Sequence, residues 1–298
     1  MYNQITSNKR KSVLLVAIFV VFIILLGWLL GEVGGYGYWG LFVAGAISLF
    51  MALFSYYGGD KVALLTSGAK GPLKKEENPY IYRLVENLCI TAGLPTPKIY
   101  VIPDPAPNAF ATGRDPQHSS IALTTGLIEN LENEELEGVI AHELSHIKNY
   151  DIRLMMLVIV LVGTVALISD WFLRVRFFGG RDNGSNGNNQ IKTILLLVGI
   201  VLAILSPLIA QLIKLAISRK REFLADADGA LLTRYPEGLA KALEKISNYK
   251  TPLKKANNAV AHLYISSPFG AKTKNSLHNL FSTHPPIEER ISSLRKMA

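Results

Sequence analysis

The sequence predicts a mainly α-helical membrane protein that carries a substantial α+β domain in water. Only 18% of its 298 residues are charged, while 49% are hydrophobic. The charges are also unevenly spread. Residues 12–31, 33–59 and 193–213 contain none, and residues 154–173 contain only Asp170. Each of these stretches reaches the roughly 20 residues that an α-helix needs to cross a bilayer, so we expect four transmembrane helices.

The first two apolar stretches predict a transmembrane hairpin within residues 1–60. The first stretch is longer than the ~7 to 15 residues of a signal-peptide core, and no small-residue cleavage pattern lies before Glu32, so we expect a retained anchor. Lys9, Arg10 and Lys11 precede this stretch, whereas the connection to the second carries no Lys or Arg. Because basic residues favour the inner side of a membrane, the N-terminus is expected in the cytoplasm.

Residues 61–153 are expected to form the first half of a cytoplasmic domain. Apolar residues at helical spacing predict an amphipathic helix over residues 79–91. A second helix is expected from an N-cap at Asn133 to about Asn149, because apolar residues recur there at every third or fourth position. Between the two helices, three short β-like runs separated by turn-forming residues predict a small antiparallel sheet. These runs are residues 98–102, 109–113 and 119–123.

The second pair of apolar stretches predicts another hairpin at residues 154–217, and residues 218–298 then form the second half of the domain. The loop of this hairpin is rich in Gly and Asn, as in a flexible linker. It also carries more basic than acidic residues, although basic residues usually lie on the cytoplasmic side of a membrane. The two halves of the domain share one side of the membrane if both stretches span it or if neither does. Whether both fully span the bilayer stays open.

The net charge of +8 does not indicate a nucleic-acid partner. Basic residues cluster in short groups at residues 74–75, 219–221 and 254–255, without interleaved aromatic side chains. Two of these groups lie near apolar stretches, which favours attraction to anionic lipid instead. The single cysteine, Cys89, cannot form an internal disulfide, as expected for a domain in a reducing compartment.

The segment HELSH at residues 142–146 places an HExxH motif on the second predicted helix. Histidines four positions apart lie on one face of a helix, so His142 and His146 can both bind one tetrahedral Zn²⁺. Glu143 is offset toward the position of the attacking water and can accept its proton. A chance occurrence of the pattern is the alternative, and the independent signs of a helix here weigh against it.

A zinc site of this kind needs a third protein ligand, and spacing alone does not choose it. Glu222 is favoured physically, because it continues the helix of the fourth apolar stretch and shares a face with Asp226. Asp226 could then accept a hydrogen bond from a ligand imidazole. The alternative for Glu222, in a basic stretch, is an exposed ion pair. Other available ligands include many carboxylates and His118, His262, His278 and His284.

Four motifs together resemble the HtpX family of membrane-bound zinc metalloproteases, which is related more distantly to the CAAX prenyl proteases. PNAFATG at residues 107–113 is similar to the family's substrate-strand motif, and AHELSH at residues 141–146 to its zinc helix. REFLAD at residues 221–226 resembles its third-ligand segment, and STHPP at residues 282–286 its C-terminal histidine motif. The resemblance covers essentially the whole chain.

The resemblance implies a zincin-like catalytic domain that holds one Zn²⁺ per chain through His142, His146 and Glu222. It implies Glu143 as the catalytic base and Asp226 as a support for the ligands. It also implies cleavage of damaged or misfolded membrane proteins at the cytoplasmic face of the cell membrane. The expected partners are therefore these unfolded substrates and the lipid bilayer, with no nucleic acid, while the oligomeric state and cleavage preference stay open.

Two further motif positions have a structural alternative. His284, before two prolines, can simply cap the final helix, or, as the resemblance implies, it can donate a hydrogen bond to the tetrahedral oxyanion. Asn108 beside a short strand is typical of a turn. Its match to the substrate-strand motif suggests instead that it forms, with Ala109, Phe110 and Ala111, a strand edge that receives the peptide.

Other functions compete with a membrane-surface endopeptidase. A protease that cuts within the membrane would need its HExxH in an apolar span, but charged residues surround this one. A prenyl-peptide protease would differ by requiring a lipidated C-terminus. A silent scaffold with structural zinc would have no need for Glu143 as a base beside its ligands.

Overall fold

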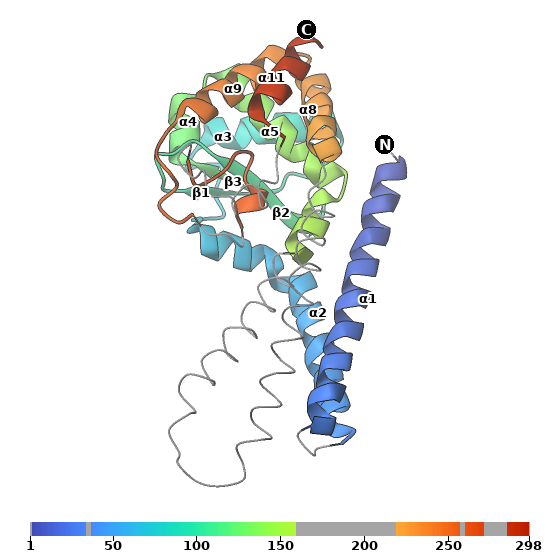
Figure 1. Cartoon of the computed structure of the whole chain (residues 1–298). Helices are drawn as coiled ribbons and strands as arrows, with labels where there is room; N and C mark the ends of the chain where they lie inside the picture. The colour runs from blue at the N-terminus through green and yellow to red at the C-terminus, as the bar shows by residue number, and fades with distance from the viewer. Residues whose placement is uncertain (1, 34–36, 159–218, 257–259, 271–284, 298) are drawn as a thin grey trace.

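The computed structural model describes residues 2–33, 37–158, 219–256, 260–270 and 285–297 (Figure 1). Two long helices lead away from a rounded domain in which helices cover a small sheet. Most of the predicted hairpin at residues 154–217 and the candidate residue His284 lie outside the described residues. The two soluble halves expected at residues 61–153 and 218–298 pack together in this domain, where α5 (Asn133–Lys148) contacts α8 (Arg219–Thr233).

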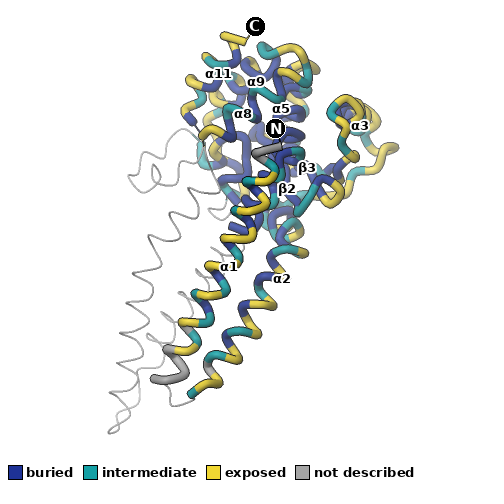
Figure 2. Tube along the Cα trace, turned by 90° about the vertical axis from the view of Figure 1, so that its right-hand side faces the viewer, coloured by how far each residue is buried: buried dark blue, intermediate teal, exposed yellow. Residues whose placement is uncertain are grey.

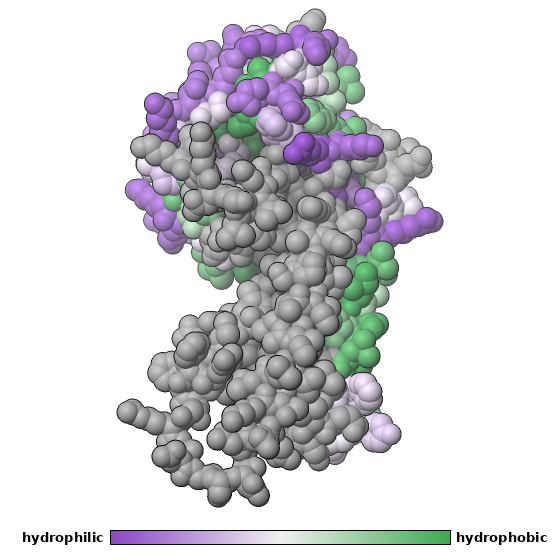
Figure 3. Space-filling model, viewed as in Figure 1, coloured by the Kyte–Doolittle hydropathy of each residue, from purple (hydrophilic) through white to green (hydrophobic). Residues whose placement is uncertain are grey.

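The two long helices are α1 (Tyr2–Val33) and α2 (Trp39–Ser67), and they pack against each other. Large apolar side chains such as Leu14 and Phe50 are exposed on them, along the alternating exposed and intermediate stretches in Figure 2. Figure 3 shows the same contrast: a hydrophobic band over α1 lies below the largely hydrophilic surface of the domain. Among the described residues, one helical stretch, Leu41–Ser67, is long and apolar enough to cross a membrane. The total of four membrane helices therefore stays a prediction.

The sheet is mixed, so the prediction of an antiparallel sheet was wrong for one of its two pairings. The strands are β1 (Lys98–Ile102), β2 (Ala109–Asp115) and β3 (His118–Thr124), in the order β1-β3-β2. β2 and β3 pair antiparallel, whereas β1 and β3 pair parallel. The reason is the connection at residues 103–108, which carries the chain from β1 past the place of β3 before β2 begins. β3 then returns between its two predecessors, and β2 is left at an edge.

Helices cover the sheet and enclose the core. α3 (Pro79–Ala92), α5, α9 (Pro236–Asn248) and α11 (Ile287–Arg295) contribute apolar side chains to one buried cluster. The short helices α4 (Thr125–Asn130) and η1 (Ala261–Leu263) complete the described elements. The apolar periodicity that predicted α3 and α5 is confirmed within a residue or two at their ends, although one apolar residue of α3, Ile90, is 74% exposed.

α5 is the central helix of the domain, and its N-cap lies one residue earlier than predicted. Glu132, not Asn133, is the N-cap, because the Glu135 carboxylate accepts a hydrogen bond from the Glu132 N–H at 2.9 Å. α8 crosses α5 closely at Gly229, where an added Cβ would lie 3.0 Å from the backbone nitrogen of His142. A side chain at Gly229 would push α8 away from α5, so this glycine sets how near the two helices come.

Candidate metal centre

α5 and α8 bring three potential metal ligands together at the centre of the domain. The Nε2 atoms of His142 and His146 lie 3.2 Å apart. The Glu222 carboxylate, from α8, reaches within 3.8 Å of His142 Nε2 and 3.6 Å of His146 Nε2. The three ligand atoms all lie within 4.8 Å of one another, and the three residues are buried. Two imidazoles and one carboxylate are a donor set that suits a catalytic divalent metal.

The outer nitrogen of each imidazole faces a carboxylate, which leaves the inner nitrogens without a proton in the neutral rings. His142 Nδ1 lies 2.9 Å from Asp226, and His146 Nδ1 lies 3.0 Å from Asp151. An Nδ1–H donated to a carboxylate leaves a lone pair on Nε2. With both rings neutral, two such lone pairs and the Glu222 carboxylate converge as acceptors, while Arg290 Nη2 lies 3.5 Å from His142 Nε2 and Arg290 Nη1 lies 3.9 Å from Glu222. A bound cation resolves this arrangement, so the residues fit a metal ion.

Arg290, on α11, holds the carboxylate that supports His142. Its Nε and Nη2 donate to the two oxygens of Asp226 at 2.8 and 2.7 Å, and its Nη1 donates to the Ile265 carbonyl at 3.0 Å. Burial disfavours the charged form of Asp226, but the Arg290 charge outweighs this effect and lowers the pKa of Asp226 to about 2. Asp226 is therefore a fixed anion beside the ring of His142.

The two histidines have opposite shifts in pKa in the metal-free site. Burial lowers the pKa of His142 to about 4, and its hydrogen bond to Asp226 offsets only part of this effect. Burial acts in the same direction on His146, but the hydrogen bond to Asp151 and the charge of Glu222 outweigh it and raise the pKa of His146 to about 9. In the absence of metal, His146 therefore holds the proton of the pair at neutral pH.

Glu143 lies on α5 between the two histidines and next to β2. Burial raises the pKa of its carboxyl group to about 7, and the Glu222 charge adds to this rise. A hydrogen bond from the Ala111 backbone N–H acts in the opposite direction. A carboxyl group with a pKa near neutrality can both accept and return a proton.

The candidate substrate strand has partners within the protein along its outer edge. The Asn108 side chain donates to the Ser266 carbonyl at 3.0 Å and accepts from the Ala109 N–H, as in a turn. The Ala109 carbonyl accepts from the Ile265 N–H at 2.9 Å. Phe110 packs edge-on against Tyr264, with ring centroids 5.1 Å apart. Asn108 to Ala111 are all buried, so the edge is covered where β2 begins.

Asp151, Arg290 and Asn8 are parts of this centre that the sequence did not reveal. Asp151 follows the HExxH helix and was visible only as one of many charges, while Arg290 and Asn8 are far away in the chain. Asn8, on α1, donates to Asp151 at 2.7 Å. His118 and His262, two of the other possible ligands, do not join the cluster: His118 pairs with Asp115, and His262 lies near the Met155 carbonyl.

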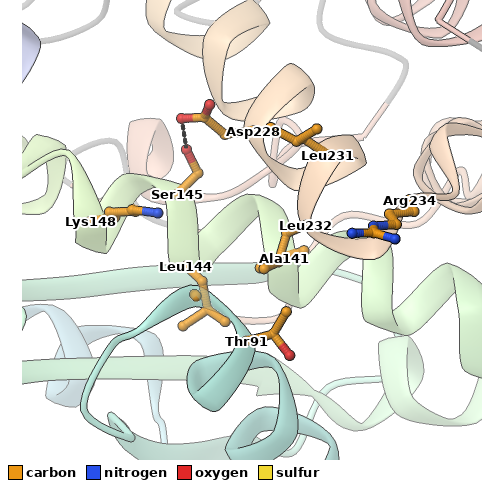
Figure 4. A pocket seen from close by; sticks show the side chains of 10 residues that line it. Thr91, Ala141, Leu144, Ser145, Lys148, Asp228, Leu231, Leu232 and Arg234 are labelled. Carbon is orange, nitrogen blue, oxygen red and sulfur yellow. Dashed lines mark hydrogen bonds between the residues drawn. The ribbon is translucent and has the colours of Figure 1, made fainter.

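A pocket on a different face of α5 is separate from the metal centre. It lies between α3, α5 and α8, and none of the three possible ligands lines it (Figure 4). Asp228 of α8 accepts a hydrogen bond there from Ser145 at 3.1 Å and another from Asn149. These bonds fasten α8 to α5, so the polar groups of the pocket act in helix packing.

Comparison with known proteins agrees with the geometry. The model of peptidase family M48 matches residues 75–298, about three quarters of the chain. The chain belongs to peptidase family M48. Its metal centre, with an HExxH helix and a third carboxylate, is that of a metalloprotease. Together with the apolar helix α2, the match supports a membrane-associated metallopeptidase.

Similar proteins cover this M48 peptidase from end to end. A protein named "Protease HtpX homolog" from Dictyoglomus thermophilum is 46% identical over 99% of this chain and 94% of its own. Another of that name, from Caldanaerobacter subterraneus, is 43% identical over 100% of this chain and 98% of its own. The crystal structure of S. mikatae Ste24p superposes with a TM-score of 0.52 at 20% identity, covering 99% of this chain and 67% of Ste24p. The first two confirm the family that the motifs resemble, and the third shows a shared fold.

Proposed function

We propose that this M48 peptidase is a zinc-dependent endopeptidase of the cell membrane that cleaves damaged or misfolded membrane proteins at the cytoplasmic face. The observation that carries the proposal is the convergence of His142, His146 and Glu222 beside the buried carboxyl group of Glu143. Three protein ligands that leave one position open are typical of catalytic zinc rather than structural zinc. The residue Glu143 also argues against a silent scaffold, because a structural site needs no base.

In this mechanism zinc, when bound, supplies a Lewis acid that polarises the scissile carbonyl and acidifies the attacking water. Glu143 accepts the proton of that water and then gives it to the departing amine. The Ala111 N–H holds the Glu143 carboxylate in place for this transfer. Asp226 and Asp151 keep the two imidazoles oriented through their Nδ1 atoms. His284 is proposed to donate a hydrogen bond to the oxyanion.

The edge of β2 is the proposed site for an extended peptide. An edge strand matches the N–H and C=O groups of many sequences, which suits unfolded substrates. Ala109 already bonds to Ile265 on this side, so an added peptide either displaces that contact or pairs beyond it, from Ala111 onward. Asn108 and Phe110 then hold the covered end of the strand rather than touching the peptide.

A cleavage assay with purified protein in detergent tests the proposed function. It compares unfolded soluble proteins with membrane proteins as substrates, with zinc present and after removal by a chelator. We expect zinc-dependent cleavage of both unfolded classes. Cleavage that requires a lipidated C-terminus would favour a prenyl-peptide protease, and no cleavage with zinc bound would favour a scaffold.

Zinc affinity should depend on pH because of His146. Its pKa of about 9 in the metal-free site means that a metal ion must displace one proton at lower pH. We therefore expect the zinc Kd to rise about eightfold between pH 8.5 and pH 7.5, measured by competition with a chelator corrected for its own protonation. A Kd that does not change over this range would show that His146 carries no extra proton in the metal-free site.

Proline at Ala111 tests the substrate edge. Ala111→Pro removes the N–H that faces Glu143 and restricts the strand, without changing a metal ligand. We expect normal zinc content and a kcat/KM for unfolded polypeptide at least ~10-fold lower, which corresponds to about 1.4 kcal/mol. Ala111→Gly is the matched control, since it keeps the N–H. Asn108→Ala is a milder second test, because it leaves the Ala111 N–H in place. If Ala111→Pro and Asn108→Ala both fold, bind zinc and cleave like the parent, this strand is structural and the substrate lies elsewhere.

The proposed topology has both the N-terminus and the catalytic site in the cytoplasm. In this topology residues 154–173 and 193–213 both span, with Gly184, outside the described residues, in an external loop. A cysteine at Gly184 in a Cys89→Ser background should then react with a membrane-impermeant thiol reagent in intact cells. Burial raises the pKa of the Cys89 thiol to about 12, so the parent protein, which keeps Cys89, should react little with the reagent and serves as a control. Reaction only after lysis would favour two stretches that do not span.

A further inference from the structure

A buried hydrogen bond connects the N-terminal helix to the metal centre. Asn8 lies near the start of α1 and is 2% exposed. Its side-chain nitrogen donates to Asp151 at 2.7 Å and to the Asn149 carbonyl at 2.8 Å, more than 140 positions along the chain. Figures 1 and 2 both show this end of α1 beside the catalytic domain. Both acceptors lie just after α5, the helix that carries the HExxH motif.

Both hydrogen bonds of Asn8 hold residues at the C-terminal end of α5. Asn149 is the C-cap of α5, and a carbonyl at a helix C-terminus has no partner within the helix. The Asn8 amide supplies one. Asp151 Oδ1 is the other acceptor, while Asp151 Oδ2 lies 3.0 Å from Nδ1 of His146. Asn8 and His146 thus hold the two oxygens of one buried carboxylate.

A further polar neighbour of Asp151, Arg221, holds the carboxylate less closely. Arg221 Nε lies 3.5 Å from Asp151 Oδ1, and none of the guanidinium nitrogens makes a hydrogen bond within the part of the chain that the structure describes. The Asn8 bond, at 2.7 Å, is therefore the close contact that fixes the orientation of Asp151. The amide itself adds no charge beside the Asp151 carboxylate.

We propose that Asn8 is a positioning residue of the metal centre: through Asp151 it orients His146, so that the first helix is part of the catalytic unit and not only an anchor. The inference rests on the proposed function in taking His146 as a metal ligand. Groups that orient a ligand imidazole typically contribute 10- to 100-fold to metal affinity. Asn8 acts one bond further away, so we expect an effect of about 5- to 10-fold.

Metal binding by the full chain in detergent tests this role. Asn8→Ala removes the amide, and Asn8→Asp keeps its shape but replaces the donor with an acceptor. Ser12→Ala is the matched control, because Ser12 is also buried on α1 and, among the described residues, its hydroxyl donates to the Asn8 carbonyl of the same helix. Each protein is stripped of metal and titrated with Zn²⁺ and with Co²⁺, whose visible absorption reports the geometry of its ligands.

We expect both Asn8 variants to raise the Zn²⁺ Kd about 5- to 10-fold and to change the Co²⁺ spectrum, with the Ser12 variant like the parent. Asn8 variants with the parent's Kd and spectrum would overturn the inference, even if their melting temperature falls, since that pattern marks a merely structural contact. A parent that binds neither metal would overturn the proposed function and this inference with it. If the parent binds both metals and the Asn8 variants have the same Kd and Co²⁺ spectrum as the parent, only this inference is overturned.

Discussion

Glu143→Gln should reduce proteolysis at least ~10²-fold while the protein keeps its metal. The amide has nearly the size of the carboxyl group but cannot accept the proton of the attacking water. It also does not touch the contacts that orient His142 and His146, which come from Asp226 and Asp151. The measurement is kcat with an unfolded substrate at saturating zinc, beside the zinc content of the purified variant.

Glu137→Gln is the control for this substitution on the same helix. The Glu137 side chain accepts a hydrogen bond from Asn133 at the surface of α5, away from the metal ligands. We expect it to leave both zinc content and kcat near those of the parent. A Glu143 variant with near-normal turnover would show that the base lies elsewhere, and one that loses its zinc would show a role in the structure of the site.

Local patterns in the sequence were enough to predict α3 and α5, with ends correct within a residue or two. Such helices have one apolar face, and the periodicity of that face is written in neighbouring residues. The strands were also found, but not the parallel pairing of β1 with β3. That pairing depends on where the connection at residues 103–108 carries the chain, which alternation of side chains does not encode.

In the metal centre too, local sequence patterns predicted some residues, and tertiary packing brings in the others. His142 and His146 lie on adjacent turns of one helix, so the sequence alone places them together. Glu222 was chosen among several ligands partly through the family resemblance, and the structure brings it to both imidazoles. Arg290 and Asn8 could not be found, because each is a single polar residue that meets the site only through tertiary packing.

Arg290→Met should lower the free energy of unfolding by about 3 to 5 kcal/mol, the usual effect of removing one partner from a buried ion pair. Arg290 is fully buried and bonds to both oxygens of Asp226. Methionine fills part of the space but leaves the Asp226 carboxylate buried without its counter-charge. Thermal or denaturant unfolding of the metal-free protein in detergent measures the effect.

The same variant should change how stability depends on pH. Arg290 lowers the pKa of Asp226 to about 2 in the folded protein, below its ordinary value of 3.8, so this ion pair stabilises the fold above that ordinary value and is lost as the pH falls toward 2. Without Arg290 the pKa of Asp226 should rise, and the variant should lose less stability on acidification than the parent does.

Arg295→Met, on the same helix, is the control. It removes exposed ion pairs with Glu237 and Glu244, and it should leave the melting temperature nearly unchanged. Equal small losses for the two arginine variants would show that Arg290 contributes little to stability, and that Asp226 holds the ring of His142 without it.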